Sequence, residues 1–335
     1  MTIKKISKEI LNKIKDINKK LDKKIKAENV VGIGKRGVVL KIDSNTCIKI
    51  SKGIGFLKRE YLCLKELNKK GIGPKVERYF EKHDAFTMEY LPGVFFEEYV
   101  SEQSSKLKIL MVIYNIIDQL FILDKLRLNK EEMHRPVKHI IVKKDKVILI
   151  DFERCKTVKK PSNLTQFIQY LTSKRLKELL SKKKIVILTK GLLNDVRKYK
   201  QNITTENLNK IKARIWFYPE SSFERIYTVV RTIPTKKLAT YGQVAKISHT
   251  NPRVVGFAMN KNPFSPIVPC HRVIGNDSLG GFAQGVDSKK KMLIREGIKN
   301  FNQESLKKHL ISNKQVVDNF KLLLNELKEH LKPQK

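Results

Sequence analysis

The stretch Pro269-Cys270-His271-Arg272-Val273 decides how this chain of 335 residues is interpreted. A cysteine is a strong nucleophile only as its thiolate, so a reactive cysteine is expected beside a base such as His271. A Cys-His dipeptide alone is weak evidence, because most free cysteines are buried and inert. The residues around Cys270 therefore have to decide whether its thiol is reactive or only structural.

Two helix-start signals precede this stretch. Thr240 and Gln243 form a capping-box pattern that predicts a short helix through Ile247. Asn251 followed by Pro252 predicts the cap and first turn of a second helix. Two short helices joined by a tight turn make a helix-turn-helix. The pattern by itself is equally compatible with an ordinary helical hairpin.

The region resembles the methylated-DNA-protein-cysteine methyltransferases, also called O-6-alkylguanine-DNA alkyltransferases, whose active-site string is P-C-H-R-V. The resemblance extends over Ser221-Ser222-Phe223, Ile233-Pro234, Thr240-Tyr241-Gly242-Gln243-Val244-Ala245, Gly256 to Asn262 and Arg295-Glu296-Gly297. It implies DNA repair by one irreversible transfer of an alkyl group from O-6 of guanine to Cys270. It implies no metal or organic cofactor for that step.

The same resemblance assigns catalytic roles. Cys270 is the acceptor, activated through a water by His271, which Glu296 orients. Tyr241 rotates the phosphate, lines the pocket and helps to protonate the departing guanine. Asn262 braces the turn between the recognition helix and the active-site loop.

The partner implied is double-stranded DNA with an alkylated guanine, bound through the minor groove. Because O-6 is inaccessible inside the duplex, the nucleotide has to flip into a pocket. Arg253 is expected to enter the base stack in its place. The residues expected to contact DNA are Arg253, Tyr241, Gly256, Ala258 and Arg272, and those expected to line the base pocket are Val273, Phe282 and Ala283. The family commonly has Tyr-x-Gly-Gly-Leu where this chain has Phe282 to Val286, a departure that bears on alkyl-group preference.

A second constellation lies in the N-terminal half. A glycine-rich stretch, Gly32 to Val39, is followed by Lys49 on an expected strand, Glu60 on an expected helix and Asp151 after an apolar strand. Glycines at such a loop let backbone amides approach phosphates. The order resembles small atypical protein kinases of archaea. It implies a site for ATP and magnesium made by Gly32, Gly34, Gly37, Lys49, Glu60 and Asp151, in which Glu60 pairs with Lys49 and Asp151 binds the metal.

The expected catalytic loop, His134 to His139, departs from that pattern. Pro136 stands where a kinase places its aspartate base, and no asparagine follows for a second metal ion. Three interpretations stay open: a pseudokinase that binds nucleotide, an atypical active kinase, and a kinase-shaped structural domain.

The composition of the chain bears on its binding partners and on its cellular compartment. The chain has 70 basic and 33 acidic residues, a formal net charge of +37, which attracts a polyanion or reflects an AT-rich genome that uses lysine everywhere. The four cysteines lack the short paired spacing of zinc sites or disulfide frameworks. The Lys-rich start, Met1 to Lys26, predicts a packed amphipathic helix rather than a membrane anchor. We expect a cytoplasmic protein with no membrane partner.

The fold class expected is α+β with two domains, a kinase-like fold followed by an alkyltransferase fold that contains a helix-turn-helix. The expected boundaries are residues 1–200 for the first domain with a helical extension, 201–218 for a linker, 219–300 for the alkyltransferase domain and 301–335 for a Lys-rich helical tail. Strands are expected at 38–42, 47–50, 85–90 and 147–150, and helices at 56–69, 222–232 and 288–295.

Two other functions compete with repair. A damage sensor that binds lesions without transferring anything would lack the acceptor, and Cys270 argues against it. A nucleotide-binding or phosphoryl-transferring protein that the repair domain tethers to DNA is the other alternative, and Pro136 argues against phosphoryl transfer.

Overall fold

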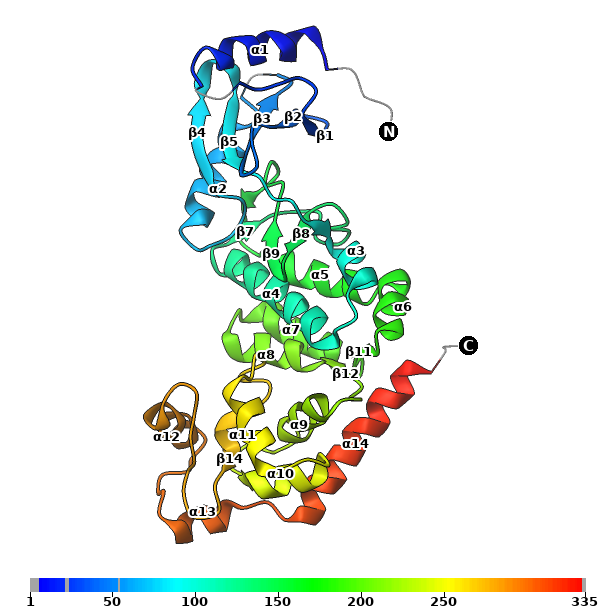
Figure 1. Cartoon of the computed structure of the whole chain (residues 1–335), viewed down its shortest axis with the longest axis vertical. Helices are drawn as coiled ribbons and strands as arrows, with labels where there is room; N and C mark the ends of the chain where they lie inside the picture. Colours follow the sequence, from blue (N-terminus) through cyan, green and yellow to red (C-terminus); the bar gives the residue numbers. More distant parts are fainter. Residues whose placement is uncertain (1–5, 22–23, 54, 333–335) are drawn as a thin grey trace. The chain divides into compact units, whose positions relative to one another are not determined.

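The computed structural model separates into two compact units, which are described here one at a time (Figure 1). It describes residues 6–21, 24–53 and 55–332. Unit 1 is Met1–Gln103 with Val112–Leu176, and unit 2 is Ser104–Met111 with Lys177–Lys335. Both units mix helices and strands, so the predicted α+β class is confirmed.

Unit 1 begins with an antiparallel five-stranded sheet in the order β1-β2-β3-β5-β4. The strands are β1 (Val30–Ile33), β2 (Gly37–Lys41), β3 (Thr46–Ser51), β4 (Val76–Phe80) and β5 (Ala85–Glu89). Helix α1 (Lys8–Asn18) buries Ile10, Ile14 and Ile17 in the same core as Val38 and Leu40. The packed amphipathic helix predicted near the N-terminus is therefore confirmed over these residues, and Met1 to Lys5 lie outside the described ones.

The rest of unit 1 contains the helix that carries Glu60 and the sheet that precedes Asp151 of the expected nucleotide site. Helix α2 (Lys58–Asn68) carries Glu60, and a sheet of β6 (Val94–Phe95), β8 (Ile140–Lys143) and β9 (Lys146–Leu149) ends shortly before Asp151. The short strands β7 (Leu128–Asn129) and β10 (Lys156–Thr157) pair beside it. The helices α3 (Phe96–Glu102) and α5 (Asn163–Leu171) belong to this part, with the 3-10 turn η1 (Glu81–His83) before β5. The helices α4 (Lys106–Lys125) and α6 (Lys174–Lys182) are each divided between the two units.

The linker expected over residues 201–218 is instead folded structure of unit 2. It contains α8 (Thr205–Ala213), capped by the Thr204 side chain, and β12 (Ile215–Phe217), whose three side chains are buried. Strand β12 pairs with β11 (Ile185–Ile187), and α7 (Leu192–Gln201) packs against α8. The polar residues that predicted a connector lie on the exposed side of α8, and the units divide at Leu176.

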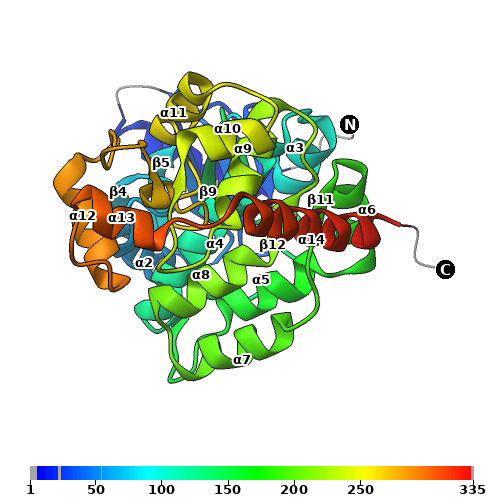
Figure 2. The same ribbon diagram turned by 90° about the horizontal axis from the view of Figure 1, so that it is seen from below.

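Three helices of unit 2 lie together in both views, α9 (Ser222–Arg231), α10 (Tyr241–Ile247) and α11 (Pro252–Asn260) (Figures 1 and 2). The predicted capping box is present, because the Thr240 side chain accepts from the amide of Gln243 and the Gln243 side chain accepts from the amide of Thr240. Asn251 caps α11 as expected, with Pro252 in its first turn. The predicted helix-turn-helix is confirmed as α10 and α11.

The reactive string lies in the 3-10 turn η2 (Cys270–Arg272), which leads into β14 (Val273–Ile274), the parallel partner of β13 (Ala239–Thr240). Helix α12 (Val286–Arg295) follows. The predicted tail is part of unit 2 and forms two helices, α13 (Gln303–His309) and α14 (Asn313–Leu331). It folds back because Leu306 joins the core of Leu238 and Ile274, and α14 packs on β11 and α9.

Within the part of the chain that the structure describes, none of the helices combines the length and the apolar content that crossing a membrane requires.

Candidate functional site

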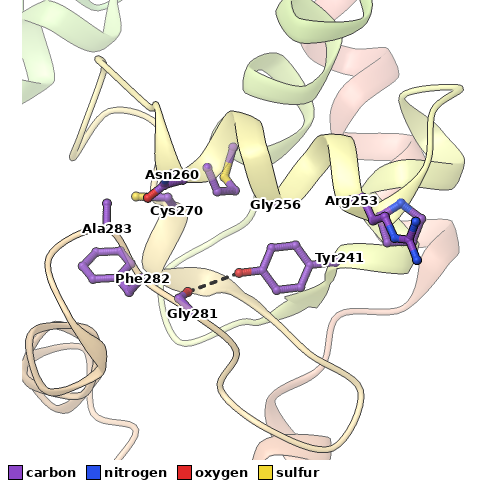
Figure 3. A pocket seen from close by; sticks show the side chains of 10 residues that line it. Tyr241, Arg253, Gly256, Asn260, Cys270, Gly281, Phe282 and Ala283 are labelled. Atoms are coloured by element: carbon purple, nitrogen blue, oxygen red, sulfur yellow. Dashed lines mark hydrogen bonds between the residues drawn. The ribbon is translucent and has the colours of Figure 1, made fainter.

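A cavity of about 580 Å³ in unit 2 has the thiol of Cys270 in its wall. It is lined by Tyr241, Pro252, Arg253, Gly256, Met259, Asn260, Cys270, Gly281, Phe282 and Ala283 (Figure 3). The lining comes from the helix-turn-helix, from η2 and from the loop before α12. The cavity therefore brings together residues far apart in the chain around one sulfur atom, and its volume is within the range of small-molecule sites.

The backbone leading to Cys270 is held by Asn262. The Asn262 amide donates to the carbonyl of Val268 (2.8 Å), and its carbonyl oxygen accepts from the amide of Phe264 (2.9 Å). Cys270 itself is only 6% exposed. The side chain of Asn262 thus fixes the turn between α11 and η2, as the expected bracing role requires, without lining the cavity.

A buried charge relay follows Cys270. Nε2 of His271, which is 3% exposed, lies 2.8 Å from Oε1 of Glu296. The guanidinium of Arg272 binds the same carboxylate through Nε and Nη2, at 2.7 to 3.1 Å. Burial alone would raise the pKa of Glu296, but the bonds from His271 and Arg272 outweigh it and lower the pKa to about 2. Glu296 is therefore an anion at every physiological pH.

The other ring nitrogen of His271, Nδ1, is buried and has no hydrogen-bond partner among the described residues. With Nε2 engaged by Glu296, Nδ1 is the nitrogen left to exchange a proton. The carboxylate fixes the ring and stabilises the charged imidazolium.

Tyr241 closes the opposite side of the cavity. Its hydroxyl donates to the carbonyl of Gly281 (3.3 Å), the dashed line in Figure 3. Gly280 has φ of 67°, and a Cβ at this position would lie 2.9 Å from the Tyr241 ring, so only glycine suits it. Burial raises the pKa of Tyr241, with a smaller contribution from the neighbouring Cys270. The phenol therefore keeps its proton and can donate it.

Helix α11 presents Arg253 and Gly256 to the cavity. Arg253 is exposed, and a Cβ on Gly256 would meet no atom within 4 Å. The fold of the free protein therefore does not require a glycine at position 256. A small residue at this position leaves room for a molecule that binds against α11 at the cavity.

Three residues expected at the DNA surface or in the pocket lie elsewhere. Ala258 is fully buried on the inner face of α11, where its carbonyl accepts from the Tyr227 hydroxyl. Arg272 is committed to Glu296, to the carbonyl of Ile233 and to Thr235. Val273 is fully buried in β14 and does not line the cavity. The helical period turns Ala258 inward and the strand pairing turns Val273 inward, whereas Arg272 is held by its hydrogen bonds. A linear motif does not reveal these directions.

Lys289 is an important residue that the sequence analysis missed. It is fully buried, and its ammonium group donates to the carbonyls of Val273 (2.6 Å) and Leu279. Burial lowers its pKa to about 8. The available signal was a lysine one helical turn before Leu293, on the apolar side of α12. Met259 and Asn260 also line the cavity and were not predicted.

Unit 1 holds a separate group of buried charges. Nζ of Lys49 lies 2.7 Å from Glu60, 2.8 Å from Glu153 and 3.8 Å from Asp151. Burial alone would lower the pKa of Lys49, but the carboxylates raise it, so the ammonium stays charged. The expected Lys49–Glu60 pair is formed, and Asp151 is near it. Glu153 was not predicted as a partner.

The glycine-rich stretch forms the turn between β1 and β2, where the amide of Gly34 donates to the carbonyl of Gly37 (2.8 Å). A Cβ on Gly37 would lie 2.9 Å from the carbonyl oxygen of Ile50, so the fold itself requires this glycine. No atom lies within 4 Å of a Cβ built on Gly32.

A divalent metal ion could be held near Asp151. Glu132, His139 and Asp151 each offer one ligand atom, and these atoms lie within 4.8 Å of one another. Burial lowers the pKa of His139, which favours the neutral imidazole that binds metals. The buried Lys130 ammonium, whose pKa burial lowers to about 8, donates to the carbonyl of Asp151 (2.8 Å). The donor set therefore fits a divalent ion, with His139 added to the Asp151 predicted.

His139 ends the expected catalytic loop, residues 134–139, and lies near Asp151. His139 precedes β8 and faces Asp151, with Nδ1 3.9 Å from the carboxylate. Pro136 is buried. Residues 134 to 139 contain no carboxylate.

Comparison with known proteins agrees with the geometry around Cys270. Residues 221–298 match the family model described as 6-O-methylguanine DNA methyltransferase, DNA binding domain. The methylated-DNA–protein-cysteine methyltransferase of Sulfolobus acidocaldarius is 46% identical over 74 residues, which cover 22% of this chain and 48% of the relative. That of Sulfurisphaera tokodaii is 47% identical over 83 residues, covering 24% and 53%. This chain spans about half the length of these relatives, and the predicted resemblance of the Cys270 region is confirmed.

Solved structures align with each part of the chain. The O6-methylguanine-DNA methyltransferase of Pyrococcus kodakaraensis is 39% identical, covers 23% of this chain and 44% of its own, and has a TM-score of 0.21. A ternary complex of APH(2")-IIa with streptomycin and ATP is 14% identical, covers 62% of this chain and 95% of its own, and has a TM-score of 0.35.

Proposed function

We propose that this chain repairs DNA by accepting the alkyl group of an O-6-alkylguanine onto Cys270. The observation that carries the proposal is the position of the Cys270 thiol, in the wall of a cavity that Tyr241 and Arg253 also line. The match of residues 221–298 to a methyltransferase DNA-binding family supports it.

The substrate would be a nucleotide flipped out of a duplex. A guanine inside the helix cannot reach a recessed thiol, and extrusion is easiest where pairing is already damaged. The exposed Arg253 side chain, at the start of α11, would fill the space that the base leaves. Gly256 would let the phosphate backbone approach the same helix closely.

The transfer would be an in-line displacement. Sγ of Cys270 attacks the alkyl carbon, and the carbon–sulfur bond forms as the carbon–oxygen bond breaks. The thiol proton leaves by way of a water toward His271, whose charged form Glu296 stabilises. The bond pair departs on the guanine oxygen, which takes a proton at the hydroxyl of Tyr241. His271 then releases the thiol proton to solvent and Tyr241 takes a proton back from solvent, so one proton moves in net from thiol to guanine and no cofactor is needed.

The thioether product is stable, so each molecule acts once. Because a thiol spent by oxidation could not accept the group, the reducing cytoplasm is the compartment in which we place the reaction.

Mass spectrometry of the intact chain tests the proposal. The protein is incubated with a duplex containing one O-6-methylguanine, beside the Cys270→Ala variant and a Cys155→Ala control. We expect a stoichiometric gain of one methyl group on the Cys270 peptide in the wild type and in the control, and none in Cys270→Ala. No gain, with retained preference for lesion DNA, would favour the sensor interpretation instead.

We propose a second activity for unit 1, the binding of ATP with a divalent ion. It rests on the buried Lys49 and its three carboxylates, since buried charges that converge on a glycine-rich turn mark functional sites more often than structural ones. Lys49 would hold phosphates, and Asp151 with His139 and Glu132 would hold magnesium, which would neutralise phosphate charge. We further propose that ATP modulates repair through this site.

Calorimetric titration of the full chain with ATP and magnesium tests this second proposal. Lys49→Ala should abolish the heat signal, whereas replacement of the exposed Lys58 by alanine should not. Equal repair rates with and without ATP and magnesium would exclude modulation, and transfer of the γ-phosphoryl group to a protein would identify the active-kinase interpretation.

A further inference from the structure

Phe257 is an exposed aromatic side chain on the second helix of the helix-turn-helix. It is 57% exposed, whereas Val255, Ala258 and Met259 on the same helix are buried. Its ring meets the edge of Phe223, with centroids 6.1 Å apart and planes at 88°. Phe223 thus holds one side of the ring and leaves the rest open to solvent.

The ring stands beside the residues that line the Cys270 cavity. Phe257 follows Arg253 by one helical turn, so the two side chains share a face of α11. It also directly follows Gly256, which lines the cavity. A partner that reaches Arg253 along this helix would therefore meet Phe257 as well.

The charge around the face of α11 that carries Arg253 and Phe257 indicates what kind of partner it binds. No residue from position 225 to position 276 is acidic, and Lys246, Arg253 and Lys261 are exposed around α11. An exposed aromatic ring on a helix that has no acidic residue, with cations around it, is complementary to a polyanion that also offers apolar surface. Duplex DNA has this character in its minor groove, where proteins insert apolar side chains between base steps.

We infer that Phe257 is a DNA-contacting wedge that sets the affinity of this chain for duplex DNA. Its ring would lie against the sugars and bases next to the nucleotide that Arg253 displaces. The contact would offset part of the cost of unstacking, since aromatic stacking on bases tolerates any sequence. The inference rests on the proposed function, because it assumes that α11 meets DNA.

Fluorescence anisotropy with the full chain tests the contact. Phe257→Ala should bind both a plain duplex and an O-6-methylguanine duplex about tenfold more weakly than the wild type. The matched control is Leu322→Ala on α14, which removes a side chain that is 71% exposed and distant in sequence from the cavity lining. Unchanged affinity of Phe257→Ala would overturn the inference and leave the exposed ring to a protein partner.

Free O-6-benzylguanine separates this inference from the proposed function. The free base needs the thiol and the cavity but no duplex, so Phe257→Ala should be alkylated by it at the wild-type rate. If the wild type binds duplex through Phe257 but accepts no alkyl group from either substrate, the proposed function fails and the DNA contact survives.

A tryptophan at the same position gives an independent signal. Phe257→Trp should restore the affinity, and its emission should be quenched when duplex is added, because the indole stacks on bases. The native Trp216 is fully buried, so the wild-type chain measures the background. Emission that does not change on saturation with duplex would overturn the wedge.

Discussion

The buried ammonium group of Lys289 donates a hydrogen bond to the carbonyl of Val273, three residues after the acceptor cysteine, at 2.6 Å. Its second bond reaches Leu279, so one side chain ties the strand after Cys270 to the loop that supplies Phe282. Lys289→Met should lower the free energy of unfolding by about 2 kcal/mol or more, because two buried carbonyls lose their donor. It should also slow alkyl transfer. Urea unfolding and single-turnover rates measure both effects, with the exposed Lys291→Met as control.

Glu296→Gln is expected to slow alkyl transfer about 10- to 100-fold, because a neutral amide stabilises the His271 imidazolium poorly. Affinity for duplex DNA should change little, since Glu296 does not line the cavity. Single-turnover kinetics at saturating protein separate the two quantities. The control is Glu304→Gln, which removes a carboxylate that is 80% exposed. A wild-type rate for Glu296→Gln would contradict the relay.

The stability of unit 2 should depend on acid through Glu296. The pKa of this carboxyl is about 2 when folded, against an ordinary value of 4.5. The unfolded chain therefore binds the proton more readily, and stability that is present above pH 4.5 is lost as the pH falls toward 2. Thermal unfolding between these limits should show a steeper loss in wild type than in Glu296→Gln. Equal slopes would assign the acid sensitivity to other groups.

Metal binding by unit 1 should depend on His139 as well as Asp151. Titration of the full chain with Mn²⁺, followed by electron paramagnetic resonance, should show one bound ion. Asp151→Asn and His139→Ala should each weaken its binding about tenfold or more. Glu178→Gln, at an exposed position, should leave binding unchanged. If only Asp151→Asn has an effect, His139 is not a ligand.

The sequence predicts local structure around Cys270 well because short-range signals determine it. The caps at Thr240 and Asn251 involve partners three residues away, so they can be identified in the chain before it folds. The pairing of Lys49 with Glu60 has a different origin, because only the resemblance to atypical kinases implies it, and the structure forms the pair.

Long-range packing could not be predicted from the same signals. Ala258 and Val273 belong to the right segment but point inward, because the neighbouring helix and strand decide which face is covered. Arg272 is held instead by Glu296 and by the carbonyl of Ile233. The polar residues of α8 predict a linker because they report only the exposed side of the helix, and its buried side is not recognised from the sequence. Burial of Lys289 depends on the carbonyls of Val273 and Leu279, which belong to other segments, and no local sequence pattern predicts these contacts.

The division of the chain has a consequence for biosynthesis. The segment Ser104–Met111, which contains the first turn of α4, belongs to unit 2, yet the next residues of the chain, Val112–Leu176, belong to unit 1. Lys106 leaves the ribosome well over a hundred residues ahead of its partners Glu220 and Glu224. N-terminal segments are synthesised first. Lys106 therefore cannot form its ion pairs until Glu220 and Glu224 have been synthesised. A truncated gene that starts at the second unit's main segment would omit it altogether.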